Sequence, residues 1–198
     1  IRILMKENLI IAIDCFSSTG KNSMSKIIAK NLNYTHIYSG AMYRAVTLYA
    51  FQKEFIKDKL IYTNSLIDNL SNINISFKKD SITSKNHTYL NGIDVEQEIR
   101  SMKISNMVSP ISEIPAVRDY CVLLQQEMGK NGGIVMDGRD IGTTVFPNAD
   151  IKIFITASPE IRAKRRFLEY QQQGKEISMD EVLKNVKERD FIDSNRDY

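Results

Sequence analysis

The sequence has few of the residues on which secreted, zinc-binding and membrane proteins depend. It contains two cysteines, Cys15 and Cys121, too few for a disulfide framework, and no cysteine and histidine cluster has zinc-ligand spacing. The apolar run at 9–13 is too short for the core of a signal peptide, and no stretch approaches the length of a transmembrane helix. These absences favour a protein of the reduced cytoplasm.

The charged residues are not clustered in any one segment of the chain. The formal net charge of the 198 residues is +3, and no block of like charge resembles a polybasic arm. A mild positive balance fits a phosphorylated ligand and does not require nucleic acid. The hydrophobic fraction of 42% is enough for a core, and we find neither an internal repeat nor a low-complexity linker. We therefore expect one globular unit that carries an inserted lobe.

A short apolar strand, a loop ending in Gly-Lys and a helix follow one another near the start of the chain. The run 9–13 suits a strand buried on both faces, and residues 24–30 predict a helix. This order is typical of a phosphate-binding loop, in which backbone N–H groups face the anion and a lysine, here Lys21, reaches the β- and γ-phosphates. The match is imperfect, because Cys15 replaces the first glycine and Asn22 replaces a hydroxyl residue. The loop alone leaves an ordinary strand–turn–helix as an equal alternative.

Strands and helices alternate through most of the chain. Further buried strands are predicted at 34–38, 134–136 and 151–155, and helices at 41–51, from Ser158 to the break at Gly174, and at 179–189. Such alternation predicts an α/β fold with a parallel sheet, in which ligands bind at the carboxyl ends of the strands. Polar segments follow these strands at 14–21, 39–44, 137–140 and 156–159.

The middle of the chain departs from that alternation. Residues 73–77 and 87–90 predict an antiparallel hairpin, and Asn91-Gly92 is a strong turn signal. Residues 101–131 predict a helical stretch that is broken near Pro110 and Pro115. We interpret this region as an inserted lobe.

Four segments taken together resemble one enzyme family. They are FSSTGK (16–21), SGAMYRAVTL (39–48), DGRDIGTTVFP (137–147) and KERDFIDSNR (187–196). In this order and spacing they resemble the bacterial cytidylate kinases, which are nucleoside monophosphate kinases of the P-loop class. Residues 99–118 and 151–166 also look like that family, so the resemblance covers nearly the whole chain from about Lys6.

The resemblance implies a three-layer P-loop NTPase fold with a central parallel sheet, an inserted lobe that contains an antiparallel hairpin, and a short helical lid. It implies a single domain over 6–198, with a core at about 6–60 and 131–198, an NMP-binding insert at about 61–130 and a lid at about 158–178. Family members continue a little beyond the position of Tyr198, so a further C-terminal segment is expected, and Met5 is the candidate natural start.

The implied reaction is phosphoryl transfer from ATP to CMP or dCMP, giving ADP and CDP or dCDP, within pyrimidine metabolism. Mg²⁺ would bridge the ATP phosphates. The acceptor phosphate is already anionic near neutral pH, so the enzyme needs cations and positioning more than a general base. The partners would be free nucleotides and not nucleic acid or a membrane, and the enzyme would be a cytoplasmic monomer.

The resemblance carries over to individual residues. The catalytic cations would be Lys21, Arg139 and Arg165. ATP binding is assigned to the loop and the lid helix, at Ser17, Ser18, Thr19, Gly20, Lys21, Asn22, Ser23, Arg162 and Arg166. CMP binding is assigned to Ser39, Arg44, Ser109, Arg118, Arg139, Asp140, Arg189, Asp193 and Arg196. The metal would be held by Ser23 and Asp137, the latter through water.

Chemistry gives the assigned cytosine pocket a preference for one base. Ser109, Arg118 and Asp140 match the family's pocket, in which a carboxylate accepts from the cytosine amino group and an arginine donates to the ring acceptors. Uracil has an oxygen in place of that amino group and would face Asp140 unfavourably. We therefore predict CMP over UMP.

Several alternatives remain open at this stage. Ser39 is equally a helix cap, Arg100 either contacts acceptor phosphate or pairs with Glu96, and which lid arginine reaches ATP is undecided. His36 and His87 have no evident partner in the sequence and are interpreted as structural. The competing functions are a P-loop kinase for another small acceptor, a non-catalytic nucleotide-binding protein with a decayed loop, and, more remotely, a nucleic-acid binder, which would require a basic stripe with interleaved aromatics.

Overall fold

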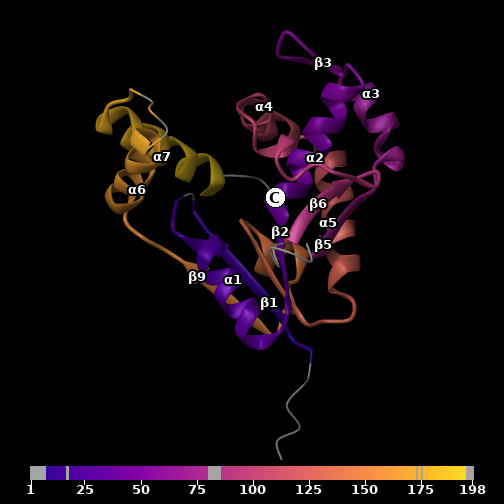
Figure 1. The fold of residues 1–198 in the computed structure, drawn as a ribbon, viewed down its shortest axis with the longest axis horizontal. Helices are drawn as coiled ribbons and strands as arrows, with labels where there is room; N and C mark the ends of the chain where they lie inside the picture. The colour runs from indigo at the N-terminus through magenta and orange to yellow at the C-terminus, as the bar shows by residue number, and fades with distance from the viewer. Residues whose placement is uncertain (1–7, 17, 80–85, 173, 175, 195–198) are drawn as a thin grey trace, which may run out of the picture. The chain divides into compact units, whose positions relative to one another are not determined.

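The computed structural model of the chain describes residues 8–16, 18–79, 86–172, 174 and 176–194. The chain divides into two compact units (Figure 1). The first unit comprises Ile1–His36 and Gly132–Tyr198, and the second unit comprises Ile37–Asn131. We describe each unit by itself.

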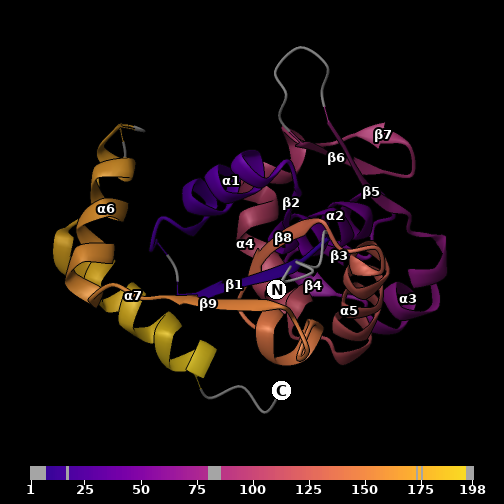
Figure 2. The ribbon, with the colours of Figure 1, turned by 90° about the horizontal axis from the view of Figure 1, so that it is seen from below.

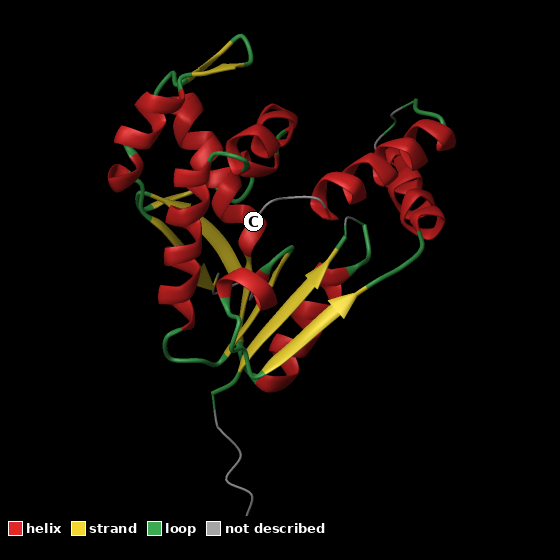
Figure 3. Ribbon diagram, turned by 180° about the vertical axis from the view of Figure 1, so that it is seen from behind, coloured by secondary structure: helices red, strands yellow, loops and turns green. Residues whose placement is uncertain are grey.

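A four-stranded sheet forms the centre of the first unit. Its strand order is β2 (Thr35–Tyr38), β8 (Ile134–Gly138), β1 (Ile10–Cys15) and β9 (Ile151–Ile155). Figure 3 shows the strands lying side by side, and β1 runs parallel to both β8 and β9. The apolar runs explain these strands, because all five residues of β8 and five of the six in β1 are buried. The chain passes from β1 first to one side of the sheet and later to the other, which makes the carboxyl end of β1 a topological switch point.

Three helices of ordinary length belong to this unit. They are α1 (Lys21–Leu32), α6 (Pro159–Gln172) and α7 (Met179–Ser194). Helix α1 packs Ala29 against Ile11 and Val135 of the sheet, and it is capped by Asn33, whose φ of 55° is left-handed. Helices α6 and α7 lie side by side in Figures 1 and 2. They bury a small apolar cluster of their own around Ala163, Val182 and Val186.

A short π-helix, Ile141–Val145, follows β8 in the first unit. It begins three residues after the strand ends, so the chain between them is only Arg139-Asp140. The sequence did not predict this element. Backbone N–H groups of Thr144 and Val145 both donate to the carbonyl of Asp140, which closes the turn.

The second unit combines helices with two small antiparallel sheets. Its helices are α2 (Ser39–Gln52), α3 (Thr63–Asp68), α4 (Met102–Ser112) and α5 (Pro115–Gly129), with 3₁₀ turns at Leu70–Asn72 and Glu98–Arg100. Its strands are β3 (Ile56–Lys57), β4 (Leu60–Ile61), β5 (Ile75–Lys79), β6 (Asn86–Leu90) and β7 (Ile93–Asp94). One apolar core gathers side chains from nearly all of these elements, including Met42, Leu66, Leu90 and Ile111.

The predicted hairpin and the predicted helices of the second unit are confirmed, with two corrections. The hairpin β5–β6 continues through the Asn91-Gly92 turn into a third strand, β7. Pro110 lies inside α4 and does not break it: the helix continues to Ser112, although the proline has no N–H to donate to the carbonyl four residues earlier. The predicted break near Pro115 is confirmed, because the helical stretch is interrupted at Glu113-Ile114 and Pro115 begins α5 at the position that suits proline.

Two boundaries also differ from the sequence expectations. Helix α7 extends to Ser194, beyond the predicted end at residue 189. Residues 37–60 belong to the second compact unit, because α2 packs against α4 and β6; the insert that the resemblance implies begins at about 61. The limits of the functional lobes stay a prediction. In the described part of the chain, no helix is long and apolar enough to cross a membrane.

Candidate active site

The loop after β1 has the backbone of an anion-binding turn. Strand β1 ends at Cys15 and helix α1 begins at Lys21. Gly20 precedes the helix with a φ of 89°, a conformation that glycine adopts at little cost, and Ser18 has a φ of 59°. Cys15 is an extended strand residue, so replacing glycine there does not require a left-handed backbone. The N-terminus of α1, with no side-chain cap, thus faces the loop with its N–H groups.

Lys21 extends from the start of α1 to the end of β8. Its Nζ donates to the carbonyl of Gly138 at 2.8 Å and lies 3.7 Å from Oδ2 of Asp137. The other carboxylate oxygen of Asp137 lies 2.7 Å from Nε2 of His36. Asp137 is fully buried, and the lysine side chain is 18% exposed. The carboxylate therefore holds the lysine against the sheet edge while the ammonium keeps access to solvent.

Two arginines also contact this loop. Nη1 of Arg139, from the segment after β8, donates to the carbonyl of Cys15 at 3.0 Å. Nη1 of Arg165, from α6, donates to the carbonyl of Thr19 at 2.8 Å. Together with Lys21 they bring three cations to the carboxyl end of β1. All three residues that the sequence analysis assigned to catalysis therefore meet at this loop.

A buried carboxylate supports the segment that carries Arg139. Asp14, the penultimate residue of β1, is 8% exposed and accepts hydrogen bonds from the backbone N–H groups of Ile141 and Gly142, at 2.7 and 2.8 Å. Burial raises the pKa of the Asp14 carboxyl, the two backbone hydrogen bonds lower it in part, and the neighbouring charge of Asp140 raises it. The carboxylate thus occupies a site where ionisation is costly.

The three lid arginines have different surroundings. Arg162 is 2% exposed, donates from Nε to the carbonyl of Ala157 at 2.8 Å and forms a bidentate ion pair with Asp190 of α7. Its Cζ also lies 5.4 Å from the centre of the Phe16 ring. Arg166 donates to the hydroxyl of Tyr170 on the same helix. Arg165 contacts the backbone of the phosphate loop, through the carbonyl of Thr19.

The predicted acceptor residues of the second unit differ in burial and in their contacts. Nη1 of Arg44, on α2, donates to the carbonyl of Ile99 at 3.0 Å and to Oγ of Ser105 at 2.9 Å. Ser39 is buried in the first turn of α2, although it is not that helix's N-cap. Ser109 is exposed on α4, and Arg118 is half-buried on α5.

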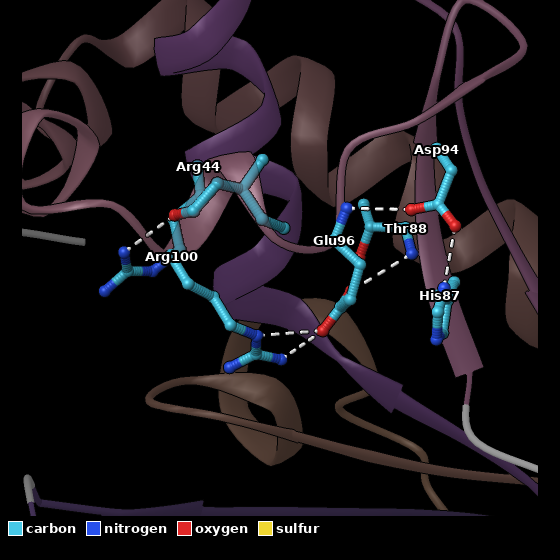
Figure 4. A network of polar contacts seen from close by, with 7 residues as sticks. Arg44, His87, Thr88, Asp94, Glu96 and Arg100 are labelled. Atoms are coloured by element: carbon cyan, nitrogen blue, oxygen red, sulfur yellow. Dashed lines mark hydrogen bonds and ion pairs between the residues drawn. The ribbon is translucent and has the colours of Figure 1, made fainter. Parts of the chain in front are cut away.

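A polar network beside Arg44 connects the β6–β7 ribbon to the 3₁₀ turn at Glu98–Arg100 (Figure 4). Glu96 accepts from Arg100 and, through its other oxygen, from the backbone and hydroxyl of Thr88. Asp94 accepts from the backbone N–H of Glu96 and lies 2.7 Å from Nδ1 of His87. Of the two alternatives for Arg100, the pairing with Glu96 is therefore the one observed here.

Some assigned residues lie outside what the structure describes. Ser17 and Arg196 are outside the described residues, and so are the side chains of Asn22, Arg189 and Asp193. Their roles stay predictions.

Oxygen donors near the loop fit a magnesium ion. Ser23 is exposed in the first turn of α1, and a hydroxyl is a ligand that Mg²⁺ accepts. Asp137, which Lys21 and His36 hold, fits an indirect role through water. Within the described residues there is no group of three or more His, Cys, Asp or Glu side chains that could hold a metal. A site built here would take most of its ligands from phosphate and water.

Sequence reasoning missed three side chains that shape this region. They are Asp14, His36 and Asp190, whose contacts with Gly142, Asp137 and Arg162 span 128, 101 and 28 residues. A charged residue directly after an apolar strand was the one available signal, and it applied to Asp14. His36 was interpreted as structural without a partner, and the structure supplies Asp137.

Comparison with known proteins agrees with this geometry. The family model described as cytidylate kinase matches residues 11–198. A protein named cytidylate kinase from Bacteroides fragilis is 53% identical over 191 residues, covering 96% of this chain and 83% of the relative. A protein of the same name from Flavobacterium johnsoniae is 51% identical over 96% of this chain and 83% of its own length.

A further relative, from Porphyromonas gingivalis and also named cytidylate kinase, is 50% identical over 193 residues, which are 97% of this chain and 84% of that protein. The family model and these relatives span nearly the whole chain. The predicted α/β class, with a central parallel sheet and a P-loop, is confirmed. The chain belongs to the cytidylate kinase family.

Proposed function

We propose that this chain transfers the γ-phosphoryl group of ATP to CMP or dCMP, giving ADP and CDP or dCDP. The observation that carries the proposal is the meeting of Lys21, Arg139 and Arg165 at the loop after β1 in a member of the cytidylate kinase family. Phosphoryl transfer between two polyanions requires this concentration of positive charge.

Each of the three cations donates to a backbone carbonyl, at the end of β8, at the end of β1 or in the loop after β1. A carbonyl is a neutral acceptor, and a phosphate oxygen is a charged one that makes a stronger bond with the same donor. Bound ATP would therefore draw Lys21 and Arg165 from the carbonyls of Gly138 and Thr19 onto its phosphates. The N–H groups at the start of α1 would complete the cradle.

The acceptor needs no catalytic base, because its attacking oxygen is already anionic near neutral pH. Arg139 would hold the acceptor phosphate through its planar guanidinium, which can offer two parallel hydrogen bonds. The protein's contribution is to bring the two phosphates together and to neutralise the charge between them. The helical lid at about 158–178, which carries Arg165, would exclude water while the acceptor is awaited.

Magnesium bound to the ATP phosphates would supply additional positive charge at the transferred group. Ser23, exposed at the start of α1, would hold that ion, and Asp137 would act on it through water. Asp137 also has a role that does not depend on the metal, since its carboxylate contacts Lys21 and fixes the ammonium beside the loop.

Acceptor binding would need further residues. The proposal assigns it to Ser39, Arg44, Ser109, Arg118, Asp140, Arg189, Asp193 and Arg196. Arg44 is already fixed by its bonds to Ile99 and Ser105, so its guanidinium loses little freedom when it binds phosphate. Asp140 would accept from the cytosine amino group, which makes CMP the expected substrate and UMP a poor one.

The proposal also includes the cellular setting. The enzyme would act as a monomer in the cytoplasm on free nucleotides, and it would not bind nucleic acid.

The test is a coupled ADP-release assay with ATP and magnesium, in which CMP, dCMP, UMP and AMP are offered in parallel. We expect turnover with CMP and dCMP and little with UMP or AMP. Lys21→Met is expected to lower kcat about 10²- to 10³-fold, the loss typical for a preorganised charge that faces the transition state. Lys26→Met, at an exposed lysine of the same helix, is the matched control and should retain wild-type turnover.

Two results would contradict the proposal. One is the absence of turnover with any acceptor in a folded sample that binds ATP. The other is equal turnover by the Lys21→Met and Lys26→Met variants.

A further inference from the structure

Asp14 holds both ends of the segment that carries Arg139 and Asp140. Its backbone pairs in register with Gly138, the last residue of β8. Its side chain accepts from the N–H groups of Ile141 and Gly142, where the π-helix begins. The two residues between these anchors therefore have little freedom to move relative to β1.

The arrangement requires a carboxylate. The two N–H groups lie 2.7 and 2.8 Å from different oxygens of the same side chain, and both bonds are buried. An ionised carboxylate accepts through both oxygens, whereas an asparagine presents one acceptor and one donor. At position 14 an amide group would place its N–H groups against a backbone N–H, which loses one bond and adds a repulsion.

Close approach at Gly142 makes these contacts possible. A Cβ added at Gly142 would lie 3.3 Å from Oδ2 of Asp14 and 3.3 Å from the side chain of Lys152. The φ of Gly142 is not among the positive values, so the residue is needed for space rather than for its backbone conformation. Glycine at this position and aspartate at 14 thus form one contact.

Burying this charge has a cost that packing alone does not explain. Desolvation raises the pKa of the Asp14 carboxyl, because burial penalises its charged form. Groups retained at such a cost are concentrated where function requires a fixed geometry. Here the fixed geometry is that of Arg139 and Asp140, which the proposed function assigns to the acceptor phosphate and the cytosine ring.

We propose that Asp14 is a positioning residue for acceptor selection: through the N–H groups of Ile141 and Gly142 it fixes Asp140 where the carboxylate distinguishes cytosine from uracil. The inference rests on the proposed function. The inference goes beyond the proposed function because it assigns a role in discriminating CMP from UMP to Asp14, a residue of the central strand that would touch neither base.

The test is the ratio of kcat/KM for CMP to kcat/KM for UMP in the wild type and in Asp14→Asn. This ratio does not depend on the amount of folded enzyme, so a merely structural role would leave it unchanged. We expect kcat/KM for CMP to fall about 10²-fold, the effect of displacing a contact group by about 1 Å. UMP should lose much less, because a displaced Asp140 no longer repels its oxygen, so the ratio falls by about tenfold or more.

Asp150→Asn is the matched control. Oδ2 of Asp150 accepts from the backbone N–H of Ile10 at 2.8 Å, which is the same kind of contact at the opposite end of β1. That substitution should change the ratio by less than about twofold, as expected for a surface site. A second variant, Gly142→Ala, keeps the carboxylate and displaces its partner, and it should lower the ratio by an intermediate amount.

The outcomes separate the inference from the function on which it rests. Failure of the wild type to phosphorylate CMP would contradict the proposed function. A wild type that is active and selective, together with an Asp14→Asn variant of unchanged ratio, would overturn the inference alone. If Asp14→Asn does not fold, Gly142→Ala decides, since an unchanged ratio in that variant would equally refute the role of the contact. Calorimetric dissociation constants for CMP and UMP measure the discrimination at the binding step, without turnover.

Discussion

The two units differ in the kind of side chain that they bury. Among the described residues, the first unit buries three charged groups, Asp14, Asp137 and Arg162. The buried polar residues described in the second unit are neutral, namely Ser39, Thr47, Thr88 and Gln125. The second unit instead gathers twenty buried residues into one apolar core. The charged groups of the first unit all lie near the phosphate loop or the lid.

This difference indicates that the two units contribute differently to stability and to activity. An apolar core stabilises a fold without specific polar partners, because hydrophobic side chains gain free energy simply by leaving water. A buried charge contributes less net stability, since desolvation opposes the attraction to its partner, and losing that partner is expensive. We therefore expect substitutions in the first unit to affect both stability and activity, and core substitutions in the second unit to act on stability alone.

The largest expected effect on stability concerns the ion pair between α6 and α7. Arg162→Met leaves the carboxylate of Asp190 without its partner, which should lower the free energy of unfolding by about 3–5 kcal/mol. Lys187 and Glu160 join the same two helices at 3.8 Å, with both side chains more than half exposed. Lys187→Met is the control and should cost less than about 1 kcal/mol. Urea unfolding measures both, and equal losses would remove the distinction between the buried pair and the exposed pair.

A core substitution in the second unit should separate stability from catalysis. Leu66 is fully buried in the apolar core, and Leu66→Ala is expected to cost about 2–5 kcal/mol through lost burial and the cavity left behind. Activity per folded molecule should stay near that of the wild type. Ile67→Ala, at the neighbouring residue, which is 38% exposed, is the control and should cost much less. A selective loss of kcat in Leu66→Ala would contradict the division between the units.

The smallest expected effect is a loss of stability at alkaline pH, which originates in two buried groups of the second unit. Burial raises the pKa of Tyr120 to about 12 and that of the Cys121 thiol to about 12. The unfolded chain releases these protons from about pH 9 to 10 upward while the folded chain keeps them, so the free energy of unfolding should fall as pH rises toward 12.

Tyr120→Phe tests this expectation. At pH 8 the variant should lose about 1 kcal/mol, because the tyrosine hydroxyl donates to the carbonyl of Ile73. Above pH 10 the variant should lose stability less steeply than the wild type, since one of the two titrating groups is gone. Urea unfolding at pH 8 and pH 11 gives both numbers, and parallel curves for the two proteins would refute the role of Tyr120.

Local features of the chain were predictable from the sequence. The left-handed cap at Asn33, the turn at Asn91-Gly92 and the start of α6 after Ser158 depend on residues within a few positions of one another. The family motifs also placed Lys21 and Arg139 in the site. In these cases the chemistry of the residue itself determines the local structure.

Contacts between distant segments could not be predicted in this way. From the sequence, Asp14 is only the polar end of a strand. The fold brings the N–H group of Ile141 beside its carboxylate. From the sequence, Arg162 is one of three equivalent lid cations. In the structure it differs from the other two because it pairs with Asp190 of α7. In each case the partner, and not the residue type, decides the role.

The close packing at Gly132 makes this position sensitive to mutation. An added Cβ there would lie 2.0 Å from the carbonyl oxygen of Asn8, and the φ of 62° is itself unfavourable for other residues. Gly132 lies just before β8, at the end of the sheet opposite the phosphate loop. Any side chain would force β8 and β1 apart at their beginnings. Substitutions of Gly132 should therefore abolish activity although the residue lies away from the phosphate loop, and a screen for loss-of-function variants would recover them together with active-site variants.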